Sequence, residues 1–191
     1  MGMETLLGIP IGIGLIAACG FRVFVPLLVM NLASLTGHLH LGSGFEWIGS
    51  TYATVAFGTA TVLEVLAYTI PWLDHILDVI TSPAAVVAGT IATASTVIDM
   101  SPFLKWTLAI IAGGGAAALV QGTTVALRTK SSALTAGMGN PLVATGEVAG
   151  SVITALLAIM VPVLCLILVA LLCIFVTWKV GRFFLGRIKI R

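Results

Sequence analysis

The stretch LLGIPIGIGLIAACGFRVFVPLLVMNLASL, residues 6–35, decides the fold, because its one charged side chain is Arg22. A helix needs roughly 20 apolar residues to cross the hydrocarbon core of a bilayer, so this stretch is long enough to span it. A guanidinium cannot shed its proton, and at the bilayer centre it costs at least ~3 kcal/mol. We therefore expect a membrane segment in which Arg22 faces protein or water, with a functional role as the default hypothesis.

The composition of the whole chain supports a lipid environment. Of the 191 residues, 59% are hydrophobic and 8% are charged, whereas soluble domains carry about 25% charged residues. The net charge is +2 and no basic patch is interleaved with aromatic residues, which excludes nucleic acid as a partner and leaves the lipid bilayer. Five basic residues crowd the C-terminus: Lys179, Arg182, Arg187, Lys189 and Arg191.

The apolar runs predict an all-α polytopic bundle of four or five spans, forming one membrane domain over residues 1–191. The segment 83–98 is short and either spans or re-enters the membrane. The uncharged run 148–178 predicts one long, tilted or kinked helix, because two separate spans would not fit in it. The expected spans are 6–35, 55–73, 83–98, 106–127 and 148–178, followed by the basic tail 179–191.

The segment WLDHILDVITS, residues 72–82, predicts a short interfacial helix. Its apolar residues repeat at helical spacing, and the acidic residues Asp74 and Asp78 interrupt the pattern. This element would lie at the membrane surface between two spans.

The basic tail predicts a cytoplasmic C-terminus, in the inner membrane of a bacterium. The tail serves either as a topology anchor or as a segment that lies on an anionic leaflet. Five spans would put the N-terminus outside, and four would put it inside. Arg128 and Lys130 conflict with both arrangements, because one predicted span separates them from the tail and so places them outside.

Glycine and proline mark points where the helices would bend or pack closely. Gly20 and Pro26 flank Arg22, so we expect a bend or a break there. Gly113, Gly114 and Gly115 each lower helix stability by roughly 1 kcal/mol relative to alanine, which predicts a hinge. Pairs such as Gly8 and Gly12 favour close helix packing, either within the chain or in a homo-oligomer or larger membrane complex.

Charges at membrane depth need partners, and the sequence offers two acid–base combinations. Glu64 lies within the second run, and its natural partner is Arg22 on the preceding segment. Arg128 ends one run and Glu147 opens the next. The repeated order of Arg then Glu is compatible with an inverted repeat, as in many transporters. Either these residues line an ion or solute path, or they are buried pairs that fix helix packing.

The loop SSALTAGMGN, residues 131–140, leads into Asn140-Pro141. This turn is either a tight re-entry into the membrane or an anion-binding element built from backbone amides. No Ser, His and acid stand at a recognisable catalytic spacing, and Cys19, Cys165 and Cys173 match no metal-ligand pattern. We expect no enzyme, no metal and no cofactor.

Four segments resemble a known family. They are GFRVFVPLL (20–28), LEVLAYTIPWLDHILDVITSPAAVVAG (63–89), VALRTKSS (125–132) and TAGMGNPLVATGEVAGS (135–151). Together they resemble the small bacterial membrane proteins grouped as domain-of-unknown-function family 4126. The resemblance implies a polytopic helical protein and singles out the same charged positions, but it implies no substrate.

The sequence predicts a small channel or transporter whose polar path is lined by Arg22, Glu64, Arg128, Glu147 and Asn140. The alternative is a membrane subunit or scaffold that does not transport, and that packs against partner helices or pigments. Water reaching Arg22 favours transport, and a dry, fully paired Arg22 favours the scaffold.

Overall fold

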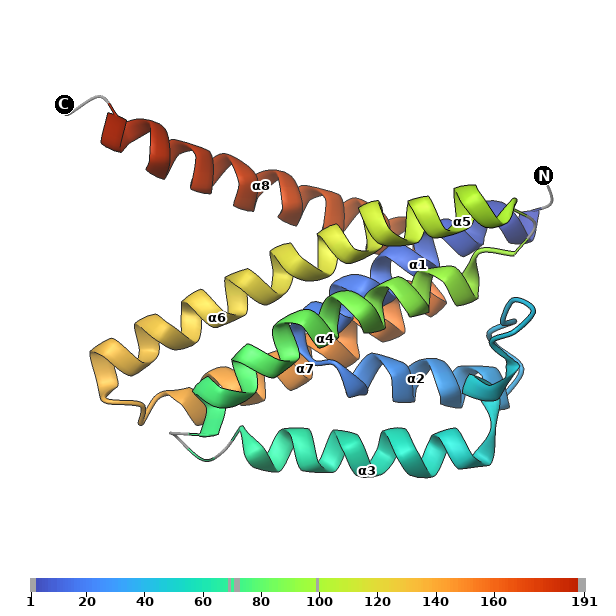
Figure 1. Ribbon diagram of the computed structural model, residues 1–191, viewed down its shortest axis with the longest axis horizontal. Helices are drawn as coiled ribbons and strands as arrows, with labels where there is room; N and C mark the ends of the chain where they lie inside the picture. Colours follow the sequence, from blue (N-terminus) through green and yellow to red (C-terminus); the bar gives the residue numbers. More distant parts are fainter. Residues whose placement is uncertain (1–2, 69, 71–72, 99, 189–191) are drawn as a thin grey trace.

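The computed structural model describes residues 3–68, 70, 73–98 and 100–188, and its regular structure is all helical (Figure 1). This confirms the predicted all-α membrane class. In chain order the helices are α1 (Met3–Phe21), α2 (Phe24–Leu35), α3 (Thr51–Ala67), α4 (Leu73–Thr96), α5 (Pro102–Leu108), α6 (Gly115–Thr135), α7 (Asn140–Met160) and α8 (Pro162–Ile188). A 3-10 turn, η1 (Glu46–Gly49), precedes α3, and a π-helical segment, η2 (Ala109–Gly114), joins α5 to α6.

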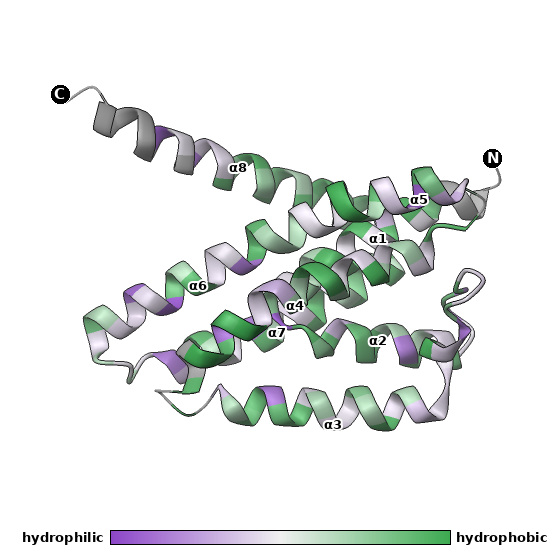
Figure 2. Cartoon of the chain, in the orientation of Figure 1, coloured by the Kyte–Doolittle hydropathy of each residue, from purple (hydrophilic) through white to green (hydrophobic). Residues whose placement is uncertain are grey.

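Four stretches in the described residues are long and apolar enough to cross a membrane: Ile76–Thr96, Pro102–Thr135, Asn140–Met160 and Pro162–Lys179. Apolar residues occur along every helix, on outer as well as inner faces (Figure 2). Large side chains such as Ile111 and Val79 remain exposed. Such outer faces suit lipid and not water.

The predicted break at Arg22 is present and divides residues 6–35 into two helices. The helix α1 ends at Phe21 and α2 begins at Phe24. Pro26 lies in the first turn of α2, where a helix needs no backbone N–H from it. The helix α2 runs in the opposite direction to α1 and packs against α3. The start of α1 and the end of α2 therefore lie at the same end of the bundle (Figure 1).

The helix α1 is the centre of the bundle and packs against α4, α6, α7 and α8. Its glycines allow the close approach. A Cβ atom at Gly14 would lie 2.5 Å from that of Ala158, and one at Gly20 would lie 2.5 Å from the Cβ of Val120. Gly8 and Gly12 face α4 in the same way, so this small-residue pair packs within the chain.

The predicted single helix over 148–178 is wrong, because the chain breaks at Val161 between α7 and α8. Pro162 disfavours the α conformation at the residue before it, and Val161 has φ −137° and ψ 66°. The helix α7 begins at Asn140, upstream of the uncharged run, which gives the length for two helices. They run in opposite directions, and the Cys165 thiol on α8 points back to the Thr154 carbonyl at 3.6 Å.

Two other predicted elements have different limits. The interfacial helix is not separate, because its residues from Leu73 onward form the first turns of α4, which continues through Pro83 and the predicted span 83–98. The predicted span 106–127 is part of the longer stretch Pro102–Thr135. The three glycines predicted to be a hinge lie at the junction of η2 and α6, where the π-helical turn inserts an extra residue into the helix.

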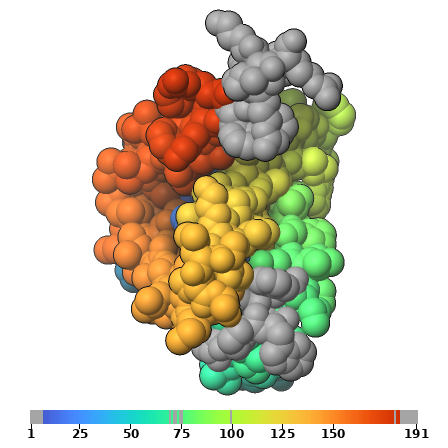
Figure 3. Space-filling model, turned by 90° about the vertical axis from the view of Figure 1, so that its left-hand side faces the viewer, coloured from blue at the N-terminus to red at the C-terminus, as the bar shows by residue number. Residues whose placement is uncertain are grey.

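The break at Val161 also removes the charge conflict. Because α7 and α8 are two passes, the end of α6 with Lys130 and the later part of α8 with Arg182 lie at the same end of the bundle (Figure 1). Figure 3 views the molecule from this end, with α6 in yellow between α7 in orange and α4 in green. We call it the basic end.

Candidate functional site

Five charged residues from separate parts of the chain meet inside the bundle near its basic end. We call them the charge cluster: Arg22, Glu64, Asp78, Arg128 and Glu147. Their exposed fractions are 1% for each arginine, 5% for Glu147, 6% for Glu64 and 8% for Asp78. Charges at this depth require partners, and each residue of the cluster has one.

Glu147 on α7 joins the two arginines. Its Oε2 atom lies 3.0 Å from Nη2 of Arg22 and 2.7 Å from Nη2 of Arg128. Arg128 also donates from Nε to Oε1 at 2.9 Å, which makes a two-pronged pair of the kind that arginine favours. The predicted pair of Arg128 and Glu147 is therefore present.

The aromatic ring of Tyr68, at the end of α3, lies next to both guanidiniums. The guanidinium carbon of Arg22 is 3.9 Å from the ring centroid, and that of Arg128 is 4.2 Å away. The Tyr68 hydroxyl donates to Oδ1 of Asp78 at 3.1 Å and is 2.8 Å from Oγ1 of Thr81. Asp78 in turn pairs with Nη1 of Arg128. Tyr68 thus links α3 to α4 and to both arginines.

Glu64 occupies a different position from the one predicted. Its carboxylate accepts hydrogen bonds from the backbone N–H groups of Val23 at 2.9 Å and Phe24 at 3.1 Å. These amides open α2 and have no partner within the helix, and a negative charge there also suits the helix dipole. The predicted pair of Arg22 and Glu64 is wrong, since the ion pair of Arg22 within the described residues is with Glu147.

Arg22 retains unused donors. Its Nη2 atom donates to the Ala144 carbonyl at 3.2 Å as well as pairing with Glu147. Its Nε and Nη1 atoms are buried and have no hydrogen-bond partner among the described residues. A guanidinium in a protein interior normally uses its donors, so these two N–H groups of Arg22 retain the capacity to bind a further acceptor.

The sequence identified four of the five cluster residues and missed part of the shell around them. Asp78, predicted to lie at the interface, is in the cluster, and the side chain of Asp74 lies outside the described residues. Tyr68 and Thr81 were missed, although Tyr68 follows Glu64 by one helical turn and Thr81 follows Asp78 by three residues. That spacing puts each pair on one helix face.

The remaining predicted residues lie around the cluster or away from it. Asn140 opens α7, is 1% exposed and donates from Nδ2 to Oγ of Ser132 at 2.8 Å. Gly20 packs against α6 just before the break, and Pro26 follows the break. Gly113 packs against Ile16 of α1 and Thr93 of α4, which are not residues of the charge cluster.

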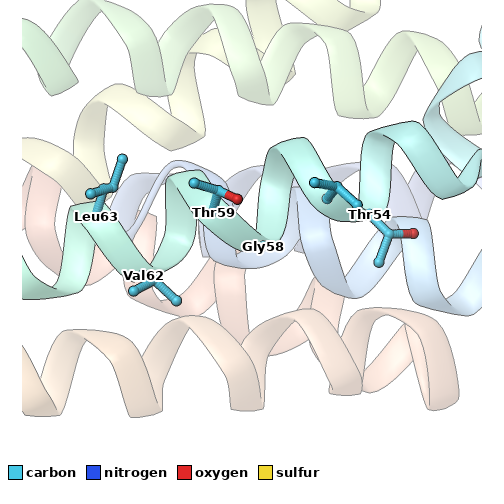
Figure 4. A pocket seen from close by; sticks show the side chains of 6 residues that line it. Thr54, Gly58, Thr59, Val62 and Leu63 are labelled. Atoms are coloured by element: carbon cyan, nitrogen blue, oxygen red, sulfur yellow. The ribbon is translucent and has the colours of Figure 1, made fainter.

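We describe two surface depressions, neither of which is lined by a cluster residue. One, of about 440 Å³, lies along α3 beside Gly58 and is lined by that helix alone (Figure 4). The other, of about 640 Å³, lies between α6 and α8. Within the described residues, no three His, Cys, Asp or Glu side chains converge as metal ligands would.

Comparison with known proteins identifies a family. No curated protein and no solved structure matches this chain. Residues 9–182, which include all five residues of the charge cluster, match the family described as "Domain of unknown function (DUF4126)". The chain belongs to this family.

Proposed function

We propose that the protein is a small membrane transporter in which the charge cluster is an occluded, proton-linked binding site. The observation that carries the proposal is the broken α1–α2 pair, which brings Arg22 into the cluster while Nε and Nη1 have no hydrogen-bond partner among the described residues. Helices broken at membrane depth, with charges beside the break, are typical of transporters. A helix bundle that needed Arg22 only for packing would gain nothing from leaving two buried donors unused.

The formal charge of the cluster supports a link to protons. Two guanidiniums face three carboxylates, so the fully ionised cluster carries one excess negative charge. Burying an uncompensated charge is expensive, and uptake of one proton removes the excess. Loss and recovery of that proton would accompany each transport cycle.

A carrier fits better than an open channel, because the cluster residues are at most 8% exposed. Access would then require movement, and two irregular points offer it: the π-helical segment η2 and the break at Val161. Helix breaks and π-bulges are frequent at functional sites. We assign no catalytic role to any residue.

We further propose that the basic end faces the cytoplasm of a bacterial inner membrane. Lys130 and Arg182 lie at this end, and the residues that follow Arg182 add more positive charge. Basic residues next to the ends of membrane helices favour the cytoplasmic side. The N-terminus would then lie outside.

The test is proton flux in liposomes that contain the purified protein and a trapped pH-sensitive dye. A pH gradient and a potassium diffusion potential drive the flux. We expect wild type to dissipate the gradient faster than empty liposomes, and Arg22→Ala and Glu147→Gln to return flux to the empty-liposome rate. Arg182→Gln, which changes an exposed charge, is the matched control and should leave flux unchanged. Wild-type flux equal to that of empty liposomes would falsify the proposal.

A scaffold is the second candidate, and the exposure of α8 favours it. In the apolar stretch Pro162–Lys179 of α8, 11% of the residues are buried, against 28% to 33% in the most apolar part of each of the other three stretches. A helix so little covered by its own chain is suited to contact with another helix. A homo-oligomer that persists in detergent, together with absence of proton flux, would support the scaffold over the transporter.

A further inference from the structure

A groove between α6 and α8 is separate from the charge cluster. Its volume is about 640 Å³, within the roughly 300–1,000 Å³ range of small-molecule sites. The two helices diverge toward the basic end, which leaves the groove between them (Figure 1). No cluster residue lines it, so an occupant would not touch Arg22 or Glu147.

The body of the groove is apolar and has small residues on one wall. Ala118, Gly122 and Ala126 repeat every four residues along α6, and Phe175 of α8 faces them across the groove. A Cβ atom at Gly122 would meet no other atom within 4 Å. This apolar wall extends along the helix from Ala118 to Ala126, which suits a hydrocarbon chain.

The end of the groove is positively charged. Lys130 from α6 and Lys179 from α8 both line it, and both are exposed. Neither ammonium has an acidic partner among the described side chains. Both lie in the part of the molecule where α6 and α8 approach the basic end. The ammonium of Lys179 lies 5.5 Å from the centroid of the Phe175 ring. Two lysines without acidic partners among the described side chains, at the end of an apolar groove, complement a phosphate that carries a hydrocarbon chain.

We propose that this groove binds one anionic phospholipid, with an acyl chain along Gly122 and the phosphate between Lys130 and Lys179. Basic pockets between membrane helices at the cytoplasmic side bind anionic headgroups. A helix of a second copy is a poorer occupant, because it would bury both lysines without a countercharge. The inference is independent of transport and stands whether or not the cluster carries protons.

The experiment measures lipid retained on the purified full-length protein by native mass spectrometry, with phosphatidylglycerol and phosphatidylcholine titrated separately. We expect wild type to prefer phosphatidylglycerol. Each lysine should contribute about fivefold to that affinity, so K130Q/K179Q should lower it roughly 25-fold. Affinity for phosphatidylcholine should not change. Lys105→Gln, at the opposite end of the bundle, is the charge control and should behave as wild type.

A second pair of variants tests the acyl chain. Gly122→Leu fills the groove, whereas Gly115→Leu adds the same side chain to the same helix at another open position. Gly122→Leu alone should lower retention of both lipids. Equal retention in the two variants overturns the proposal. So does full displacement of the lipid by inorganic phosphate, which would mean that charge alone is recognised. A wild-type dimer that Gly122→Leu converts to monomer also overturns it, in favour of a second copy.

Discussion

The guanidinium carbon of Arg22 lies 3.9 Å from the centroid of the Tyr68 ring, and the guanidinium carbon of Arg128 lies 4.2 Å from the same centroid. Tyr68→Phe keeps both of these contacts and loses the hydroxyl bonds to Asp78 and Thr81, which should cost about 1–3 kcal/mol of unfolding free energy. Tyr68→Leu also removes two desolvated cation–π contacts, each worth about 2 kcal/mol. Unfolding in mixed detergent micelles should therefore rank wild type, Phe and Leu in falling order of stability. Equal stability of the two variants would contradict the role of the ring.

The carboxylate of Glu64 satisfies the first amides of α2. Glu64→Ala leaves the N–H groups of Val23 and Phe24 buried without an acceptor, at a cost of about 1–3 kcal/mol each. Glu64→Gln keeps one acceptor and should lie between wild type and alanine. Glu46 accepts from the Gly44 amide on the surface, so Glu46→Ala is the matched control and should cost under about 1 kcal/mol. An alanine effect at Glu64 no larger than at Glu46 would rule out this role.

Arg22 and Glu147 should show strong coupling in a double-mutant cycle. Glu147→Ala leaves the buried charge of Arg22 without its ion-pair partner, which costs about 3–5 kcal/mol, whereas Arg22→Ala leaves Glu147 paired with Arg128 and should cost less. The double variant should be less destabilised than the sum of the two, by about 1–3 kcal/mol. Unfolding free energies of the four proteins give the coupling directly. Additive effects within about 0.5 kcal/mol would mean that the two side chains do not interact in the folded protein.

Two glycines should respond to alanine with opposite signs. At Gly14 a Cβ atom would lie 2.5 Å from Cβ of Ala158 and 2.7 Å from Sγ of Cys165, so Gly14→Ala should destabilise by about 1–3 kcal/mol. At Gly58, within α3, a Cβ atom meets nothing within 4 Å. Gly58→Ala should therefore stabilise by about 0.5–1 kcal/mol. Thermal unfolding of both variants checks the signs, and destabilisation by both would show that the outer face of α3 is covered.

The proposed orientation predicts a labelling pattern in intact cells. Ser43 lies between α2 and α3, and Met138 lies between α6 and α7 at the basic end. A membrane-impermeant maleimide should label Ser43→Cys in intact cells and Met138→Cys only after permeabilisation. Wild type is the control for Cys19, Cys165 and Cys173. The reverse pattern would mean that the basic end faces outward.

The sequence predicted the membrane class, the break at Arg22 and four of the five cluster residues. These follow from local signals, because apolar run length, Gly20 with Pro26, and rare charges in apolar runs are visible without the fold. The partners were harder. Glu147 can meet both arginines only because α1 and α6 pack against α7, and neighbouring position along the chain wrongly favoured Glu64 as the partner of Arg22.

The break at Val161 was missed for a physical reason. A proline in an apolar run either kinks a membrane helix or ends it, and the sequence around Pro162 does not distinguish the two. The α4 helix contains Pro83 and continues, whereas α7 stops before Pro162. At Pro162, the packing of α8 against α1 and α7 favours a break over a kink. The break places Lys130 at the same end of the bundle as the later part of α8.

The contact between Arg22 and α7 has a consequence for biosynthesis. Arg22 donates to Ala144, which is 122 residues further along the chain. At ~5–20 residues per second, the ribosome completes that stretch roughly 6–24 s after Arg22 is made. During this interval Arg22 lacks both of its contacts on α7, the Ala144 carbonyl and the Glu147 carboxylate. Because α1 and α2 both pack against α7, we expect these first helices to complete their packing only after α7 has been made.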